Sequence, residues 1–152
     1  MAVKLNSVQL IYIATMEPVG EEGRKRIKRH RQMREKKNFQ TVECYRNLEI
    51  LTISKDSTVL LECLSNLAAN EMFQERGTKE KAFASMKRGI VSLQNQGQNL
   101  IIVTNNIFED GILYDKETMT YMELLGEINQ WICREADQVH EVIHGIPLIL
   151  KK

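Results

Sequence analysis

Short apolar segments alternate with longer stretches of helix-forming residues along this chain. The apolar segments are rich in β-branched and aliphatic side chains, which predicts buried strands. They cover residues 8–14 (VQLIYIA), 57–62 (STVLLE), 99–104 (NLIIVT) and 138–143 (QVHEVI), and residues 41–44 (TVEC) are a candidate for a further short strand.

Four predicted helices separate these strands. Thr78 is placed to cap the third helix, and Gly97 is placed to end it. In the fourth, apolar side chains recur at steps of three or four residues, the spacing of one helix face. The first has few apolar residues, so we expect most of its surface to face solvent or a charged ligand. The helices cover residues 21–35, 64–73, 79–96 and 116–136.

Strands that alternate with helices predict an α/β fold, with a three-layer αβα arrangement around a mainly parallel sheet. We expect one domain over residues 1–152, with the strand at 138–143 in this sheet and residues 144–150 as a short C-terminal extension. Ligands of such sheets bind at the carboxyl ends of the strands. The residues at those ends are therefore the candidates for chemistry.

Polar side chains stand at three of the predicted strand ends. Thr15 follows the first strand, Glu62 ends the second and Thr104 ends the third. Hydroxyl groups suit phosphate oxygens, and a carboxylate suits Mg²⁺. The same residue types also occur in ordinary turns between strands and helices, so the pattern leaves both interpretations open.

The composition is typical of a globular protein, at 43% hydrophobic and 27% charged residues. No apolar run approaches the ~20 residues of a membrane-spanning helix, so we expect no membrane span. The three cysteines form no CxxC pair. Such scattered thiols favour a reduced, cytoplasmic protein over a secreted one.

Positive charge is concentrated in one segment, although the net charge is only +1. Residues 24–37 hold nine of the 21 Lys and Arg residues, which indicates an anionic partner. His30 lies among these cations, where a neutral imidazole would be a nucleophile facing a bound polyphosphate. A surface histidine on a solvated helix is the alternative. Nucleic acid is a further alternative partner, but the aromatic residues that stack on bases are missing from the segment.

Several motifs, in order along the chain, resemble the bifunctional adenosylcobinamide kinase/adenosylcobinamide-phosphate guanylyltransferase family. They are YIAT (12–15), RIKRHR (26–31), TVEC (41–44), VLLEC (59–63), SNL (65–67), NE (70–71), IVTN (102–105), GEIN (126–129), ADQV (136–139) and GIP (145–147). Each is weak alone, but the ordered set is specific.

The resemblance implies a P-loop NTPase-like fold and a homo-oligomer, typically a trimer. It implies phosphorylation of adenosylcobinamide by GTP or ATP with Mg²⁺, followed by transfer of GMP from GTP through a GMP–histidine intermediate. Guanine nucleotide and the cobinamide substrate are then the partners, with no nucleic acid and no tightly bound cofactor.

The resemblance also assigns individual residues. His30 matches the histidine that accepts the guanylyl group, and Glu62 becomes the candidate Mg²⁺ ligand. The implied nucleotide-binding residues are Ala14, Thr15, Met16, Arg31, Gln32, Met33, Arg34, Glu43 and Glu62.

One family motif, the phosphate-binding GxxxxGK(S/T) loop, does not occur in these 152 residues. Residues 1–6 resemble the last turns of the helix that follows such a loop, so we expect the chain to start at an internal methionine, without the first strand and the loop. The loop's backbone N–H groups and lysine hold phosphates together. We therefore expect impaired activity. A catalytically inactive homologue that serves as a binding or regulatory subunit is the alternative.

Overall fold

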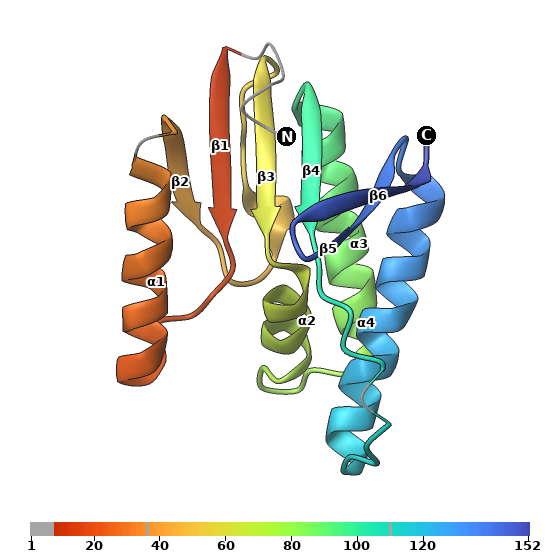
Figure 1. The fold of residues 1–152 in the computed structure, drawn as a ribbon. Helices are drawn as coiled ribbons and strands as arrows, with labels where there is room; N and C mark the ends of the chain where they lie inside the picture. The colour runs from red at the N-terminus through yellow and green to blue at the C-terminus, as the bar shows by residue number, and fades with distance from the viewer. Residues whose placement is uncertain (1–7, 36, 110) are drawn as a thin grey trace.

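A computed structural model describes residues 8–35, 37–109 and 111–152. Its centre is a sheet of four parallel strands in the order β2-β1-β3-β4, with helices flanking it (Figure 1). The strands are β1 (Gln9–Ala14), β2 (Phe39–Glu43), β3 (Ser57–Glu62) and β4 (Asn99–Val103). The predicted α/β fold with a mainly parallel sheet is confirmed, and the candidate short strand at 41–44 is one of its members.

The helices follow the predicted ranges within one or two residues. Thr78 caps α3, because its side-chain oxygen accepts the Lys81 N–H at 3.3 Å. Asp115 caps α4 through the Thr118 N–H at 2.9 Å. The helices are α1 (Gly20–Glu35), the short 3₁₀ helix η2 (Leu48–Ile50), α2 (Leu64–Met72), α3 (Lys79–Gln96) and α4 (Lys116–Glu135).

The main core lies between the sheet and the helices α2, α3 and α4. Burial of each large aliphatic side chain contributes about 1.5–3 kcal/mol, so this layer fixes the central strands in place. β1 and β3 supply Ile11, Ile13, Val59 and Leu61, and the helices supply Leu64, Leu67, Met86, Ile90, Leu93, Leu124, Leu125 and Ile128.

Helix α1 takes little part in this core. Among its side chains that the structure describes, none is buried, and Ile27 and His30 are the partly covered ones. The helix instead reaches the sheet through a contact of His30 with Glu62 and an ion pair of Arg31 with Glu43. Exposed pairs of this kind contribute only about 0–1 kcal/mol each, so α1 is more weakly attached than the other long helices.

The C-terminal segment differs from the prediction. Residues 138–143 were expected in the parallel sheet, but β5 (Val139–Ile143) pairs antiparallel with β6 (Ile146–Lys151) in a separate two-stranded sheet. The cause is a two-residue turn in which His144 and Gly145 have φ of +51° and +81°. Positive φ at both central residues is typical of the turn that closes a tight hairpin. The expected extension over 144–150 is therefore mostly strand.

The N-terminal helix expected over residues 1–6 lies outside the described residues. In the part of the chain that the structure describes, no helix is both long enough and apolar enough to cross a membrane.

The close approach of α3 to η2 depends on Gly89. A Cβ added there would lie 2.6 Å from Leu48 Cβ and 3.3 Å from Leu48 Cα. We predict that Gly89→Ala lowers the free energy of unfolding by about 1–3 kcal/mol, because the packed helices must separate to admit the methyl group.

Gly126 provides the matched control, since it also lies inside a long helix. A Cβ there would meet only the Phe108 ring, at 3.7 Å. Gly126→Ala should leave stability unchanged or raise it by up to about 1 kcal/mol through the better helix propensity of alanine. Urea denaturation measures both variants, and equal effects would contradict the packing argument.

Candidate functional site

Two carboxylates flank the carboxyl end of the central strand β1. In the register of the sheet, Ala14 pairs with Glu43 at the end of β2 and with Glu62 at the end of β3. The three strand ends therefore lie at one level, at the edge drawn at the bottom of the sheet in Figure 1. The strand-end rule placed Glu62 at this edge, and the resemblance implied Glu43, which the structure places on the other side of β1.

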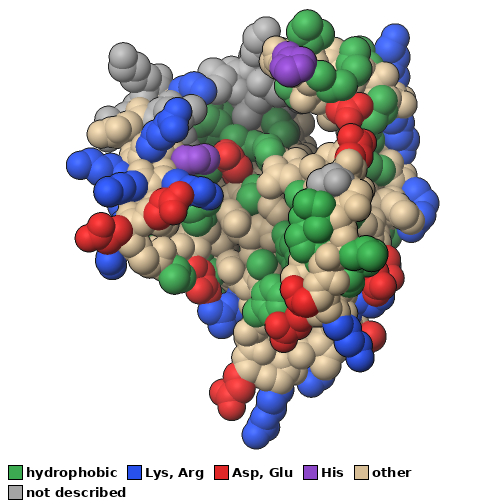
Figure 2. Space-filling model, turned by 60° about the horizontal axis from the view of Figure 1, so that its bottom comes forward, with side chains coloured by type: hydrophobic (Ala, Val, Ile, Leu, Met, Phe, Trp, Pro, Cys, Tyr) green, Lys and Arg blue, Asp and Glu red, His purple; other side chains and the backbone are tan. Residues whose placement is uncertain are grey.

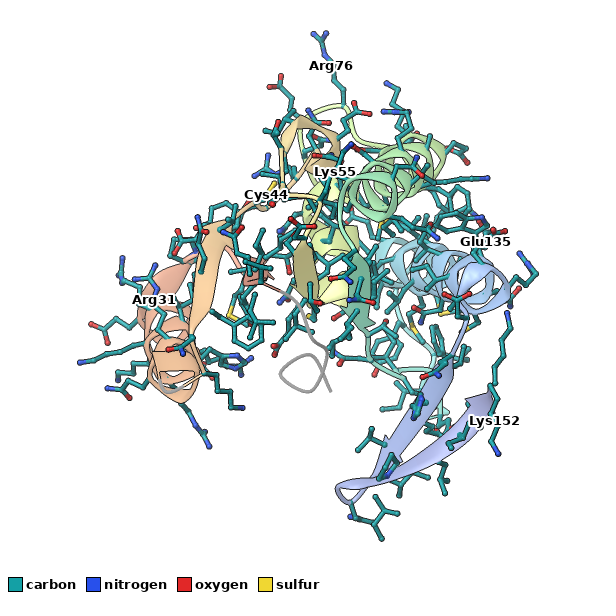
Figure 3. The ribbon with its side chains drawn as sticks, turned by 90° about the horizontal axis from the view of Figure 1, so that it is seen from above. Arg31, Cys44, Lys55, Arg76, Glu135 and Lys152 are labelled. Atoms are coloured by element: carbon teal, nitrogen blue, oxygen red, sulfur yellow. The ribbon has the colours of Figure 1, made fainter. Side chains whose placement is uncertain are left out.

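Helix α1 brings two consecutive side chains to these carboxylates. His30 Nδ1 lies 3.5 Å from Glu62 Oε1, within ion-pair range. Arg31, labelled in Figure 3, forms an ion pair with Glu43. The side chains of His30 and Glu62 remain 41% and 30% exposed, so a ligand at this edge can reach both.

This arrangement suits attack on a phosphorus atom. A carboxylate that faces Nδ1 orients the imidazole and favours the tautomer whose Nε2 carries the free lone pair. Basic side chains gather over α1 on the same side of the molecule, as Figure 2 shows. Arg and Lys groups in such a position bind phosphate oxygens with charge-assisted hydrogen bonds. The site therefore combines a partly exposed imidazole beside a carboxylate with nearby cations, which is an arrangement suited to an anionic phosphate ligand.

Thr15 occupies a different environment from the one the sequence indicated. Its side chain is fully buried, and its hydroxyl donates to the Cys63 carbonyl at 2.8 Å and accepts from the Cys63 N–H at 2.9 Å. The hydroxyl thus bonds to main chain and joins the end of β1 to the residue after β3. The main chain of Cys63 therefore engages this hydroxyl, and a contact of Thr15 with nucleotide stays a prediction.

Tyr45 is a site residue that sequence reasoning missed. Its hydroxyl donates a hydrogen bond to Glu43 Oε2 at 2.9 Å, beside the oxygen that Arg31 binds. Partial burial raises the pKa of the Tyr45 phenol, and the hydrogen bond to the Glu43 carboxylate raises it further. The sequence contained one signal for Tyr45: it is an aromatic residue two positions after Glu43, the acidic residue that ends β2.

The sequence of residues 1–150 matches the family model described as cobinamide kinase / cobinamide phosphate guanyltransferase. The chain belongs to this family. Two curated relatives are both called bifunctional adenosylcobalamin biosynthesis protein CobU. The one from Salmonella typhimurium is 27% identical over 157 residues, covering 94% of this chain and 86% of the relative. The one from Escherichia coli is 28% identical over 160 residues, covering 96% and 88%.

The other residues that the kinase/guanyltransferase resemblance implied lie in and after β1 and in α1. Ala14 ends β1, and Met16, partly exposed, follows it by two residues. Gln32 is exposed on α1, directly after Arg31. Met33 and Arg34 belong to α1, but their side chains lie outside the described part. Their contacts with nucleotide stay predictions.

Glu62 fits a limited role in binding Mg²⁺. Within the described residues, no group of three or more His, Cys, Asp or Glu side chains could hold a metal ion. Mg²⁺ in kinases is usually bound by one or two carboxylates together with substrate phosphates. A single, partly exposed carboxylate at the strand ends meets that requirement, provided that a nucleotide supplies the other oxygens.

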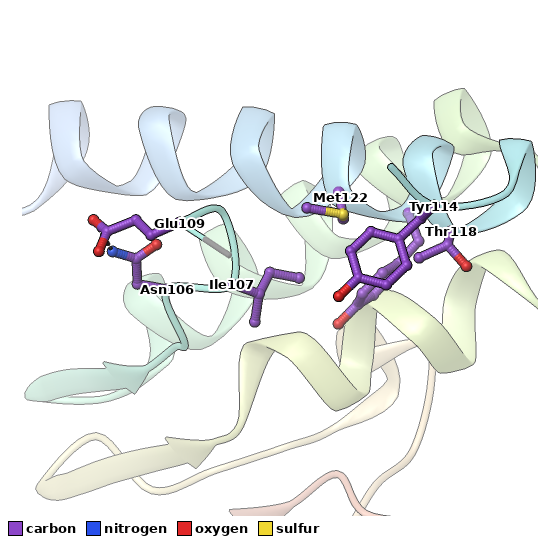
Figure 4. A pocket seen from close by; sticks show the side chains of 7 residues that line it. Asn106, Ile107, Glu109, Tyr114, Thr118 and Met122 are labelled. Atoms are coloured by element: carbon purple, nitrogen blue, oxygen red, sulfur yellow. Dashed lines mark hydrogen bonds between the residues drawn. The ribbon is translucent and has the colours of Figure 1, made fainter. Parts of the chain in front are cut away.

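A separate pocket of about 460 Å³ lies between the loop after β4 and helix α4 (Figure 4). None of the residues assigned by the family resemblance lines it. Several of its polar groups already have protein partners; for example, Tyr121 donates to the Ser65 carbonyl at 3.2 Å. Its lining residues are Asn106, Ile107, Glu109, Tyr114, Thr118, Tyr121 and Met122.

Proposed function

We propose that this protein acts in cobalamin biosynthesis, as an adenosylcobinamide kinase and a GTP:adenosylcobinamide-phosphate guanylyltransferase. Its substrates are a guanine nucleotide and the cobinamide compound, and GTP or ATP donates the phosphate in the kinase step. Membership of the kinase/guanyltransferase family supports the proposal. The observation that carries it is the contact of Glu62 with His30, which lies on a helix rich in cations.

In the guanylyl transfer, His30 Nε2 attacks the α-phosphorus of GTP. A P–N bond forms, the bond from the α-phosphorus to the bridging oxygen breaks, and pyrophosphate leaves with the electron pair. A phosphate oxygen of adenosylcobinamide phosphate then attacks the same phosphorus. The P–N bond breaks, His30 is regenerated and adenosylcobinamide-GDP is released.

The protein's own groups have distinct tasks in this sequence. Glu62 holds the Nδ1 side of the His30 ring and stabilises the positive charge that the ring acquires as the P–N bond forms. The α1 cations bind the triphosphate and the departing pyrophosphate. Glu62 would also share Mg²⁺ with the phosphates, and the ion would offset part of their negative charge.

We also propose the remaining nucleotide contacts and the properties that the resemblance implied. The contacts come from Ala14, Thr15, Met16, Arg31, Gln32, Met33, Arg34 and Glu43. The protein is a cytoplasmic homo-oligomer, a trimer by resemblance, without a tightly bound cofactor. The 152 residues contain no GxxxxGK(S/T) motif, and we expect these residues by themselves to bind triphosphate weakly. The second candidate is an inactive homologue with a binding or regulatory role.

Labelled GTP distinguishes these functions. The protein is incubated with Mg²⁺ and millimolar GTP that carries radioactive phosphorus at either the α or the γ position. We expect the α label to stay on the denatured protein and the γ label to leave with pyrophosphate. The bond should be acid-labile, as phosphoramidates are. Retention of the γ label would contradict nucleotidyl transfer, and retention of neither label would favour the inactive homologue.

A further inference from the structure

The side-chain amide of Asn70 joins two segments that end neighbouring strands. Asn70 lies on α2, and its Nδ2 donates to the Thr15 carbonyl at 2.8 Å and to the Tyr45 carbonyl at 2.9 Å. Thr15 follows β1 and Tyr45 follows β2. An amide nitrogen has two hydrogens, and here each of them serves a different strand end.

The Thr15 side chain extends this connection to the third strand end. Its hydroxyl bonds to both the N–H and the carbonyl of Cys63, the residue directly after Glu62. Main-chain bonds already join these ends, from the Cys44 N–H to the Ala14 carbonyl at 3.0 Å and from the Thr15 N–H to the Glu62 carbonyl at 3.2 Å. Asn70 and Thr15 add side-chain links beyond the last paired residues of β1, β2 and β3. Because α2 is packed in the core through Leu64 and Leu67, Asn70 stands on a rigid support.

The groups that hold the proposed nucleophile depend on these same ends. Glu62 precedes Cys63 and contacts His30, while Tyr45 donates its hydroxyl to Glu43, the partner of Arg31. The spacing between the two carboxylates determines where α1 can place His30 and Arg31. A misplacement of about 1 Å in such an arrangement can lower a rate by about 100-fold.

We propose that Asn70 is a positioning residue for guanylylation of His30. It acts through the main chain of Thr15 and Tyr45 and, together with the main-chain pairing of the strands, holds the Glu43 and Glu62 carboxylates at their separation. The inference rests on the proposed function, since it concerns the same histidine. Asn70 thus influences the geometry of the reaction although it lies on helix α2, outside the strand ends.

Gln96 offers a matched control for the loss of an amide bridge. Its Oε1 accepts the Ile53 N–H at 2.9 Å, and its Nε2 donates to the Leu51 carbonyl at 3.1 Å and to Ser92 Oγ at 3.0 Å. These bonds tie the end of α3 to the segment before β3, away from the strand ends that bind His30 and Arg31. Gln96→Ala therefore removes a comparable bridge without reaching the site.

The test compares Asn70→Ala and Gln96→Ala by melting temperature and by the maximal rate of α-labelling with Mg²⁺ and GTP. We expect similar decreases in melting temperature, a labelling rate at least ~10-fold lower for Asn70→Ala, and a rate within about twofold of the original for Gln96→Ala. An Asn70→Ala rate no lower than that of Gln96→Ala would overturn the positioning role. If the unmodified protein takes no label, the proposed function itself fails, and this inference fails with it.

A second measurement needs no nucleotide. In protein labelled with ¹⁵N-histidine, Asn70→Ala should shift the ring resonances of His30 and leave those of His140 and His144 unchanged. Gln96→Ala should shift none of the three. Asn70→Ser, which keeps one donor on a shorter side chain, replaces the alanine variant if the latter does not fold. Unchanged His30 resonances in the Asn70 variant would count against the inference.

Discussion

Replacement of Thr15 with valine is expected to lower the free energy of unfolding by about 1–3 kcal/mol. Valine has nearly the same shape as threonine, so the packing of this fully buried position changes little. The loss comes instead from the Cys63 N–H and carbonyl, which both lose the Thr15 hydroxyl as a partner. The Cys63 carbonyl keeps the Leu67 N–H as a donor at 3.3 Å, so the main cost falls on the Cys63 N–H, which loses its acceptor. Urea denaturation measures the change.

Thr15→Ser is the matched control, because it keeps the hydroxyl and removes only a methyl group. We expect it to cost less than Thr15→Val, at about 0.5–1.5 kcal/mol. The valine variant should also take α-label from GTP more slowly, since the end of β1 then keeps its main-chain bond to the Glu62 carbonyl but loses both hydroxyl bonds to Cys63. A valine variant that is as stable as the serine variant would show that the hydroxyl does not hold these strand ends together.

Replacement of His30 with asparagine should abolish transfer of the α-phosphate label from GTP to the protein. The asparagine side chain can still donate a hydrogen bond towards Glu62, but it has no imidazole nitrogen to form the P–N bond. Loss of a nucleophile that forms a covalent intermediate typically lowers the rate by several orders of magnitude, so we expect a decrease of at least ~1,000-fold. The decrease should come with little loss of stability, because His30 is partly exposed on the solvated helix α1.

The control for His30→Asn is the same replacement at His140, an exposed histidine in strand β5. His140→Asn should take the label at the original rate.

A third variant, Glu62→Gln, removes the charge beside Nδ1 of His30 and keeps the shape of the side chain. It should still take the label, but more slowly, by about 10- to 100-fold, since the charge that forms on the ring loses its carboxylate partner. Equal labelling of all three variants would mean that another residue accepts the GMP.

The sequence was sufficient to predict most strands of the main sheet and the helices beside it, because β1, β3, β4, α3 and α4 have distinct apolar patterns. The segment of β2 was only a candidate strand, and α1 was predicted from its helix-forming residues. Residues 57–62 and 79–96 agree with β3 and α3 at both ends, and Thr78 caps α3 as expected. The hairpin of β5 and β6 was missed for a local reason. The His144-Gly145 pair adopts positive φ at both positions, and a histidine at the first of them is a weak turn signal.

The candidate site could be predicted only in part. The strand-end rule found Glu62, and the cluster of cations drew attention to His30. Their contact could not be predicted, because it depends on how the segment between β1 and α1 sets the helix against the sheet. In the sequence, Asn70 was noted only as part of the NE motif at 70–71. Its bonds to Thr15 and Tyr45 could not be predicted, because these residues are far from Asn70 along the chain and meet it only in the folded structure.

Mass spectrometry of the protein after incubation with Mg²⁺ and millimolar GTP tests the central claim most directly. Proteolysis under alkaline conditions preserves a phosphoramidate, so that the modified residue can be located by fragmentation. The account predicts one GMP group on the peptide that contains His30, and none on the peptides that contain His140 or His144. A GMP group on another residue, or an unmodified His30 under conditions in which the protein forms adenosylcobinamide-GDP, would contradict it.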